Sequence, residues 1–319
     1  MPWASEHRSS GRGVRWLGVA TALLLAACGD YSTEDVRFLA ALPIRQDMRV
    51  EVPAAAAGTQ AACGTAEAEV WLGAKPTSDG LNASVDFLVA LVDAVRRFPP
   101  TDRREDARRW GPFDDDKHPG REIQVTIARS GGGGAVVHTY RFEGRVKGGG
   151  AWTAILTGSF RGPSAEIGTG ELQLSFEALW TLGMNDADTP RGAMLASYDR
   201  TSEPRTVDLS LGQGGFGVGQ FQYGFAGYRD GSGWFEYLIR PPARPLDTLT
   251  ITSSFDAAGA GRAEVVYESF LLEGSYRQCW DAFACLVYVD DPSSYSCDTP
   301  PCSFGEVASC PPVPLSPFP

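Results

Sequence analysis

Few residues in this chain could carry acid–base chemistry near neutral pH, because it has only three histidines. His118 directly follows a run of aspartates, and His138 begins the apolar face of an alternating run. A serine could form a catalytic triad with either of these histidines, which keeps a hydrolase open as an alternative. No nucleophile-elbow, zinc-protease or phosphate-loop motif selects a partner, however. A histidine packed and hydrogen-bonded in the core is the favoured interpretation of His138.

Two acidic loops contain the oxygen ligands that a hard cation such as Ca²⁺ prefers. Asp114 and Asp116 are the candidate ligands in the first loop, and Asp186 and Asp188 are those in the second. Neither loop has the EF-hand spacing, and both lack its bidentate glutamate. A solvated turn is therefore the favoured interpretation of both loops, and the sequence predicts no metal ion or other cofactor.

The first 27 residues have the composition of an export signal. Arg8, Arg12 and Arg15 precede an apolar run over residues 17–27. As a helix, this run would reach about 16 Å, which is too short for a hydrocarbon core of about 30 Å. The run therefore predicts a signal peptide and not a membrane span.

The leader ends in Leu25-Ala26-Ala27-Cys28-Gly29, which resembles the lipobox of bacterial lipoproteins. The resemblance implies that Cys28 is lipidated and becomes the N-terminus, so that acyl chains anchor the protein in a membrane. Aspartate follows at position 30 and not directly after the cysteine, which favours sorting to the outer membrane, with the body facing the periplasm or the cell surface. The alternative is a free cysteine after an ordinary signal peptide.

Three further runs, over residues 110–113, 259–262 and 279–281, resemble lipoproteins of myxobacteria-like, high-GC Gram-negative bacteria. This second resemblance implies no activity and transfers no functional residue.

Cysteine usage agrees with export. Besides Cys28 there are six cysteines, and five of them lie in the last 41 residues. An oxidising compartment would allow up to three disulfides, and one from Cys63 to the tail would close a loop of more than 200 residues. A zinc site is the alternative, but no histidine or second close cysteine pair supports it. The disulfide candidates are Cys63, Cys279, Cys285, Cys297, Cys302 and Cys310.

The formal net charge of the chain is −11 and its isoelectric point is about 4.8. Nucleic-acid binding requires a basic surface, so this charge argues against it. The charge also predicts that the body stands away from an anionic lipid surface, with the lipid as its only attachment.

Apolar and polar residues alternate with a period of two in about ten runs between residues 121 and 275, separated by glycine-rich turns. The pattern predicts a mainly β fold, an antiparallel meander that forms a barrel, half-barrel or sandwich, with one or two packed helices. We divide the chain into a signal peptide (1–27), a mixed helix and strand segment (28–119), an antiparallel β domain (120–275) and a cysteine-rich tail with a proline-rich end (276–319).

Two helices are expected in the mixed segment. Residues 32–35 can cap a short helix that ends before Pro43. A second helix is expected over residues 84–97, where apolar residues recur at helical spacing and Asn82 or Ser84 can serve as a cap. Short strands are expected over residues 48–52 and 69–72.

Aromatic residues gather between residues 221 and 237, and one of these strands is apolar on both faces. Trp234 and Leu238 share one face, and Phe235, Tyr237 and Ile239 share the other. The helix over residues 84–97 covering one face is the favoured interpretation. The alternative is a lumen for a hydrophobic ligand, as in the periplasmic lipoprotein-localisation proteins, which the chain is similar to in architecture only.

Together these features predict a lipid-anchored cell-envelope protein with a binding or structural role and no enzymatic activity. The expected partners are the membrane, through the lipid on Cys28, and an envelope protein or a hydrophobic ligand, with no nucleic acid. A carrier of a hydrophobic ligand or lipid and a hydrolase on a β scaffold are the two alternatives.

Overall fold

The fold is taken from a computed structural model of the chain. It describes residues 31–44, 48–53, 63, 66–131, 136–164, 167–186, 191–212, 220–240, 246–269, 273–292 and 302–314. Cys28, Asp188 and Cys297 lie outside these ranges.

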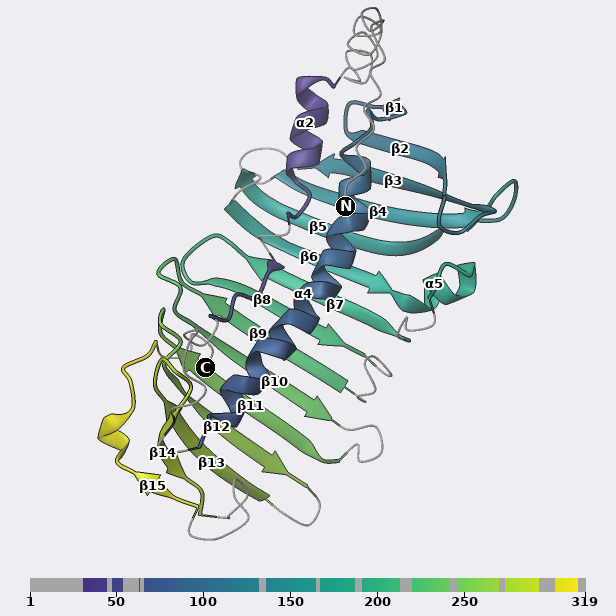
Figure 1. Cartoon of the computed structure of the whole chain (residues 1–319). Coiled ribbons are helices and arrows are strands. Elements are labelled where there is room, and N and C mark those ends of the chain that lie inside the picture. Colours follow the sequence, from purple (N-terminus) through teal and green to yellow (C-terminus); the bar gives the residue numbers. More distant parts are fainter. Residues whose placement is uncertain are drawn as a thin grey trace, which may run out of the picture.

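A single antiparallel sheet forms the body of the protein (Figure 1). Its fifteen strands stand side by side in sequence order, with β1 and β15 at the two edges. The prediction of a mainly β antiparallel meander is confirmed, and within the described residues the sheet stays open and does not close into a barrel. The strands are β1 Asp102–Arg103, β2 Ala107–Asp114, β3 Arg121–Ser130, β4 Val136–Val146, β5 Thr153–Ser164, β6 Ile167–Ser175, β7 Ala193–Asp199, β8 Arg205–Leu211, β9 Gln220–Gly227, β10 Gly233–Arg240, β11 Thr248–Phe255, β12 Gly261–Glu268, β13 Glu273–Trp280, β14 Leu286–Asp290 and β15 Phe304–Gly305.

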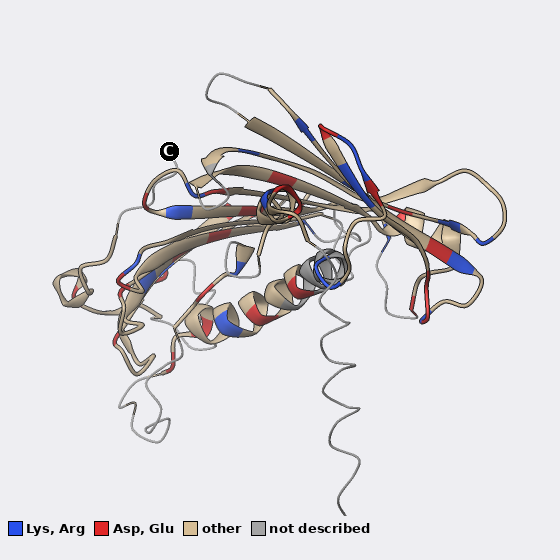
Figure 2. Cartoon of the chain, turned by 90° about the horizontal axis from the view of Figure 1, so that it is seen from above, with Lys and Arg blue, Asp and Glu red and all other residues tan. Residues whose placement is uncertain are grey.

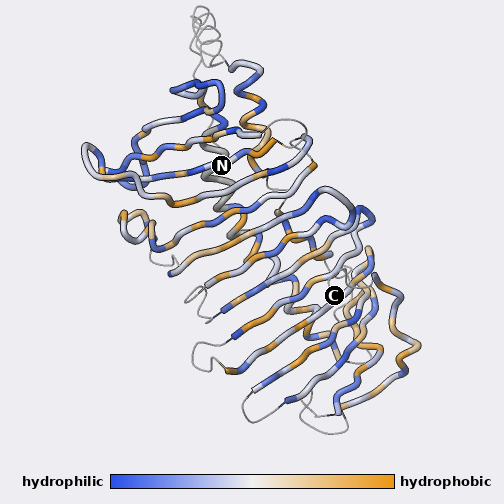
Figure 3. The backbone as a smooth tube through the Cα atoms, turned by 180° about the vertical axis from the view of Figure 1, so that it is seen from behind, coloured by the Kyte–Doolittle hydropathy of each residue, from blue (hydrophilic) through white to orange (hydrophobic). Residues whose placement is uncertain are grey.

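Hydrophobic and hydrophilic residues alternate along the strands (Figure 3), and the matching alternation in burial gives the sheet a buried face and a wetter face. In β8, for example, Val207, Leu209 and Leu211 are buried, whereas Asp208 between them is exposed. The sheet curves around the long helix α4 (Glu69–Val95), so that its buried, inner face contacts this helix (Figures 1 and 2). On the opposite, outer face, Glu171, Asp208 and Gln222 of the central strands are exposed to solvent, whereas Trp234 is buried.

Helix α4 begins fifteen residues before the expected start, and the prediction of a strand over residues 69–72 was wrong. Val70, Trp71, Ala74, Leu81 and Val85 are buried at helical spacing, and they belong to one core with the sheet. A window of four residues is too short to separate a period of two from a period of 3.6. In the described part of the chain, the helices are too short or too polar to cross a membrane.

The first half of α4 covers the aromatic side chains of the inner face. The Trp71 ring lies 5.4 Å from that of Phe255 and 5.5 Å from that of Trp280, measured between ring centroids. A helix does lie on the inner face, but the contacts described are made by the turn around Trp71 and involve Phe255 and Trp280, not the aromatic residues 221–239 that the 84–97 segment was expected to cover. Of the predicted apolar stripe over residues 84–97, Val85 is the residue whose side chain is described, and it is buried.

Residues 48–52 do not form the expected strand. The backbone N–H and carbonyl of Val50 are nevertheless both hydrogen-bonded, as they would be in a strand. The Val50 backbone N–H donates to Asn82 Oδ1 at 2.9 Å, and Asn82 Nδ2 donates to the Val50 carbonyl at 2.8 Å. Asn82 thus replaces a neighbouring strand as the hydrogen-bonding partner. It lies in the middle of α4 and is not a cap.

The short helix α2 (Thr33–Ala40) confirms the expected capping motif, with Ser32 and Asp35 forming a reciprocal capping box. The described part of the chain also contains α5 (Phe176–Leu182) and a 3₁₀ turn, η2 (Val307–Ser309).

Two disulfides hold the far end of the sheet. Cys63 is bonded to Cys285, 222 residues away in sequence, and Cys279 is bonded to Cys310. Cys302 is also disulfide-bonded. In the chain-entropy account, closing a loop as long as the first stabilises the folded state by about 5 kcal/mol. The expected link between Cys63 and the cysteine-rich tail is therefore present.

Candidate functional site

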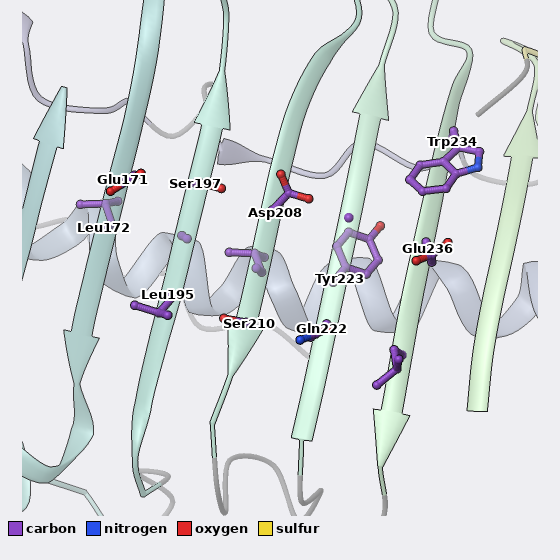
Figure 4. A pocket seen from close by; sticks show the side chains of 14 residues that line it. Glu171, Leu172, Leu195, Ser197, Asp208, Ser210, Gln222, Tyr223, Trp234 and Glu236 are labelled. Atoms are coloured by element: carbon purple, nitrogen blue, oxygen red, sulfur yellow. The ribbon is translucent and has the colours of Figure 1, made fainter. Parts of the chain in front are cut away.

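A shallow depression of about 580 Å³ lies on the outer face of the sheet, across β6 to β10 (Figure 4). Figure 4 shows the lining residues along strands β6 to β10, with α4 behind the sheet. The depression is lined by Glu171, Leu172, Leu195, Ala196, Ser197, Asp208, Leu209, Ser210, Gln222, Tyr223, Gly224, Trp234, Glu236 and Leu238.

Strand register places three carboxylates in one row across this floor. Glu171 is paired with Ser197, Ser197 with Asp208, Asp208 with Gly224, and Gly224 with Glu236. The carboxylates therefore stand on alternate strands and are separated by small residues. Because neighbouring strands lie about 4.8 Å apart, the acidic residues recur about every 9.6 Å along the row.

Gly224 keeps the middle of the row open. A β-carbon at this position would lie 3.3 Å from Asp208 Oδ1 and 3.6 Å from Cζ3 of Trp234. The carboxylate of Asp208 and the indole of Trp234 therefore border the same hollow. A larger residue would place its side chain between them.

Apolar side chains complete the depression. Trp234 is buried. Leu195 is an apolar residue among polar neighbours and is 49% exposed. In the next register row, Leu195 pairs with Ser210, Ser210 with Gln222 and Gln222 with Leu238. The site thus combines a row of negative charge with an aromatic ring and two leucines.

Within the described residues, none of the three carboxylates forms an ion pair. Glu236 accepts a hydrogen bond from Thr252 Oγ1 at 3.2 Å. Asp208 is exposed to solvent overall, but the surrounding protein displaces part of the hydration of its carboxylate, and this partial desolvation raises its pKa above the ordinary value. Glu264, further along the same row, differs because Arg277 donates two hydrogen bonds to it, at 2.9 and 3.0 Å.

This geometry suits a ligand that carries several separated positive charges. Carboxylates about 9.6 Å apart cannot share one Ca²⁺ ion, whose ligands stand at 2.3–2.6 Å. Among the described residues, no group of three or more histidine, cysteine and acidic side chains is arranged to hold a metal ion. Amine or guanidinium groups on an extended ligand could pair with the row of carboxylates beside the buried Trp234.

The two acidic loops predicted from the sequence lie close together. Lysine side chains form ion pairs with an aspartate of each loop. Lys147 pairs with Asp114 at 2.6 Å, and Lys117 reaches across to Asp186 at 2.7 Å. Asp116 is exposed to solvent.

The two histidines lie far apart in the sheet. His118 Nδ1 lies 2.8 Å from Asp115 Oδ2, and Asp115 Oδ1 also accepts the backbone N–H groups of Lys117 and His118. The hydrogen bonds of the Asp115 carboxylate therefore fix the turn that contains Lys117 and His118.

His138 is half-buried, with its ring edge-on to Phe38 at 6.0 Å. Burial, and then the charge of Arg129, lower the pKa of His138. It packs on its neighbour as expected, but its Nδ1 is buried without a hydrogen-bond partner among the described residues, contrary to the expectation of a hydrogen-bonded histidine.

Sequence reasoning did not identify Glu171, Asp208 and Glu236 as a group. Each was recognisable as an outward residue of an alternating strand, but 65 residues separate the first from the last. Only the pairing register of five strands brings them into one row.

Comparisons of this chain with protein-family models, curated proteins and solved structures found no match.

Proposed function

We propose that this chain is a lipid-anchored cell-envelope protein that binds a cationic partner in the outer depression. The observation that carries the proposal is the row formed by Glu171, Asp208 and Glu236, three carboxylates that form no ion pair with any described residue and lie beside Trp234. The lipobox-like leader supports anchoring through Cys28. The disulfides support an oxidising compartment outside the cytoplasm.

The partner that fits best is an extended basic segment of another envelope protein. Its positive side chains would pair with carboxylates spaced about 9.6 Å apart, and its aliphatic stems would cover Leu195 and Leu238. A depression of this kind, open to solvent along one face of a sheet, admits a chain without requiring the fold to open. No bond is made or broken in this role.

A hydrophobic-ligand carrier receives less support from the packing of the inner face. Phe221, Tyr223, Phe235 and Tyr237 stack on one another at centroid distances of 5.9 to 6.5 Å. They belong to the same core as Trp71 of α4. These aromatic residues contact protein on the inner face, so they give no observation in favour of a ligand there.

Anchoring is tested by expressing the full chain and its Cys28→Ala variant in a Gram-negative host and separating membranes from soluble protein. We expect the parent chain in the membrane fraction and the variant in the soluble fraction, because acyl chains supply the attachment. Equal partitioning of the two chains would contradict lipid anchoring. A Ser309→Ala variant, which alters an exposed residue of the tail and leaves the disulfides intact, serves as the control.

Binding is tested by titrating the chain with tetralysine and following tryptophan fluorescence. The variant Glu171→Gln, Asp208→Asn, Glu236→Gln should raise the Kd about tenfold or more, because it removes the charge that attracts the probe. Added salt should weaken binding to the parent chain.

The control for this titration carries the same charge change at exposed acidic residues elsewhere, Glu51→Gln, Asp116→Asn, Glu273→Gln. We expect its Kd to stay close to that of the parent chain. Equal weakening by the two triple variants would show that net charge, and not the depression, attracts the probe.

A further inference from the structure

The end of the sheet nearest the proposed anchor carries the opposite charge to the chain as a whole. Residues 96–109 contain six arginines and three acidic residues, although the formal net charge of the chain is −11. These residues include the exit from α4, the strand β1 and the start of β2, which lie at one end of the sheet beside α2 (Figure 1).

Three carboxylates at this end are each shared between two arginines. Glu34 pairs with Arg37 and Arg129. Asp35 pairs with Arg103 and Arg108. Asp102 pairs with Arg104 and Arg109, at 3.4 and 3.5 Å. With Arg96, Arg97 and the exposed carboxylates Glu105 and Asp106 included, this end carries eight arginines and five carboxylates, so a positive surplus of three remains.

Much of this surplus charge is at the surface. The side chain of Arg104 is 70% exposed and that of Arg37 is 65% exposed. Arg97 and Arg109 are also exposed, and so is Phe98 between them in sequence. We call the exposed arginines Arg37, Arg97, Arg103, Arg104 and Arg109 the arginine surface.

The chain is fixed to this end of the sheet immediately after the proposed anchor. Tyr31 donates its hydroxyl hydrogen bond to the Arg96 carbonyl at 3.0 Å, and Ser32 and Asp35 then close the capping box of α2. Cys28 stands only three residues before Tyr31, and three residues span at most about 11 Å. A lipid on Cys28 would therefore hold this end within about one Debye length of the bilayer surface, where charges still interact.

We infer that the arginine surface docks on anionic lipid headgroups of the membrane that the Cys28 lipid enters, so that the sheet stands on its β1 end. This inference rests on the proposed lipid anchoring. Guanidinium groups pair with phosphate oxygens in a bidentate manner, and Phe98 suits the interfacial region beside them. The overall acidity of the chain, which predicted a body repelled from such a surface, belongs to other parts of the molecule.

The test uses the full lipidated chain, purified in detergent and reconstituted into two kinds of vesicle. One kind is phosphatidylcholine alone, and the other contains about a third phosphatidylglycerol. Hydrogen exchange read by mass spectrometry reports the backbone of residues 96–106. We expect exchange there to be about fivefold slower or more on the anionic vesicles, and this slowing to disappear at about 1 M salt.

A triple variant, Arg97→Gln, Arg104→Gln, Arg109→Gln, should lose the slowing. It spares the buried pair of Asp35 and Arg108, so the fold is retained, as its denaturation midpoint would show. The matched control, Arg205→Gln, Arg229→Gln, Arg262→Gln, changes exposed arginines elsewhere and should keep the slowing.

The outcomes separate the docking inference from the anchoring proposal. A chain that floats with both vesicles, but whose exchange over residues 96–106 is the same on both, is anchored and does not dock, which overturns the inference alone. A chain that floats with neither vesicle overturns the anchoring proposal and the docking inference with it.

Discussion

Two aspartates of this protein have pKa values shifted in opposite directions. Asp35, at the arginine-rich end, is fully buried, and burial by itself would raise its pKa. Hydrogen bonds from Ser32, Arg108 and Arg103 outweigh burial and lower the pKa to about 2. Asp208, in the outer depression, has no such partners among the described residues, and burial raises its pKa.

The difference separates a region whose charges stabilise the fold from one whose charges are available to a partner. At the first end, Asp35 pairs with Arg103 of β1 and Arg108 of β2 and so fixes α2 against these two strands. In the depression, Asp208 loses part of its hydration and gains no ion pair from the described residues. Native charges that weaken stability in this way are typical of binding sites.

Replacing Asp35 should produce the largest effect on stability. Asp35→Ala leaves the Arg108 guanidinium buried without its carboxylate, and breaking such a pair costs about 3–5 kcal/mol. Denaturant unfolding with the disulfides intact would measure the loss.

The control for this variant is Arg37→Gln, which removes an exposed partner of Glu34 and should cost less than about 1 kcal/mol. A loss of similar size in the two variants would contradict the stabilising role assigned to the buried pair.

The pH dependence of the free energy of unfolding should show whether the pKa of each aspartate is lowered or raised by folding. Because the folded pKa of Asp35 lies below its unfolded value of about 4, its contribution is present above pH 4 and is lost as the pH falls towards 2. The difference in stability between the parent chain and Asp35→Asn should therefore shrink by about 2 kcal/mol across that range. A difference that stays constant with pH would show that the ion pairs do not shift the pKa.

Asp208→Asn should have the smallest effect and the opposite sign. A raised folded pKa means that the ionised group lowers stability, increasingly as the pH rises through that pKa. The variant should be more stable than the parent chain at neutral pH, by a few tenths of a kcal/mol since the group is partly solvated.

Below the unfolded pKa of aspartate, Asp208→Asn and the parent chain should have equal stability. Denaturant midpoints at acidic and neutral pH would report both values. A variant that is less stable at neutral pH would mean that Asp208 has a stabilising role, which would remove the contrast between the two aspartates.

Local patterns in the sequence were enough to predict the antiparallel meander and the cap of α2. Alternation over runs such as residues 171–174 shows which side chains point inward, and Ser32 with Asp35 is a local capping motif. The start of α4 was not predictable in the same way, because Val70 and Trp71 fit a strand as well as a helix until their packing on the sheet is known.

Neither charged region could be read from the sequence as a surface. Asp35 and Arg108 are 73 residues apart and meet because α2 packs on the first strands. Glu171 and Glu236 belong to one row only through the register of the strands between them. The net charge of the chain sums the arginine-rich end and the acidic depression into one negative value. For this reason it suggested a uniformly acidic body.

The most direct test of the central claim is zero-length cross-linking of tetralysine to the full chain with a carbodiimide, followed by peptide mapping. Amide bonds form only where a probe amine already contacts a carboxylate. The account predicts cross-links concentrated on Glu171, Asp208 and Glu236 and competed by salt. Cross-links distributed over exposed acidic residues such as Glu51, Asp116 and Glu273 would contradict it, because the depression would then attract a cation no better than the rest of the surface.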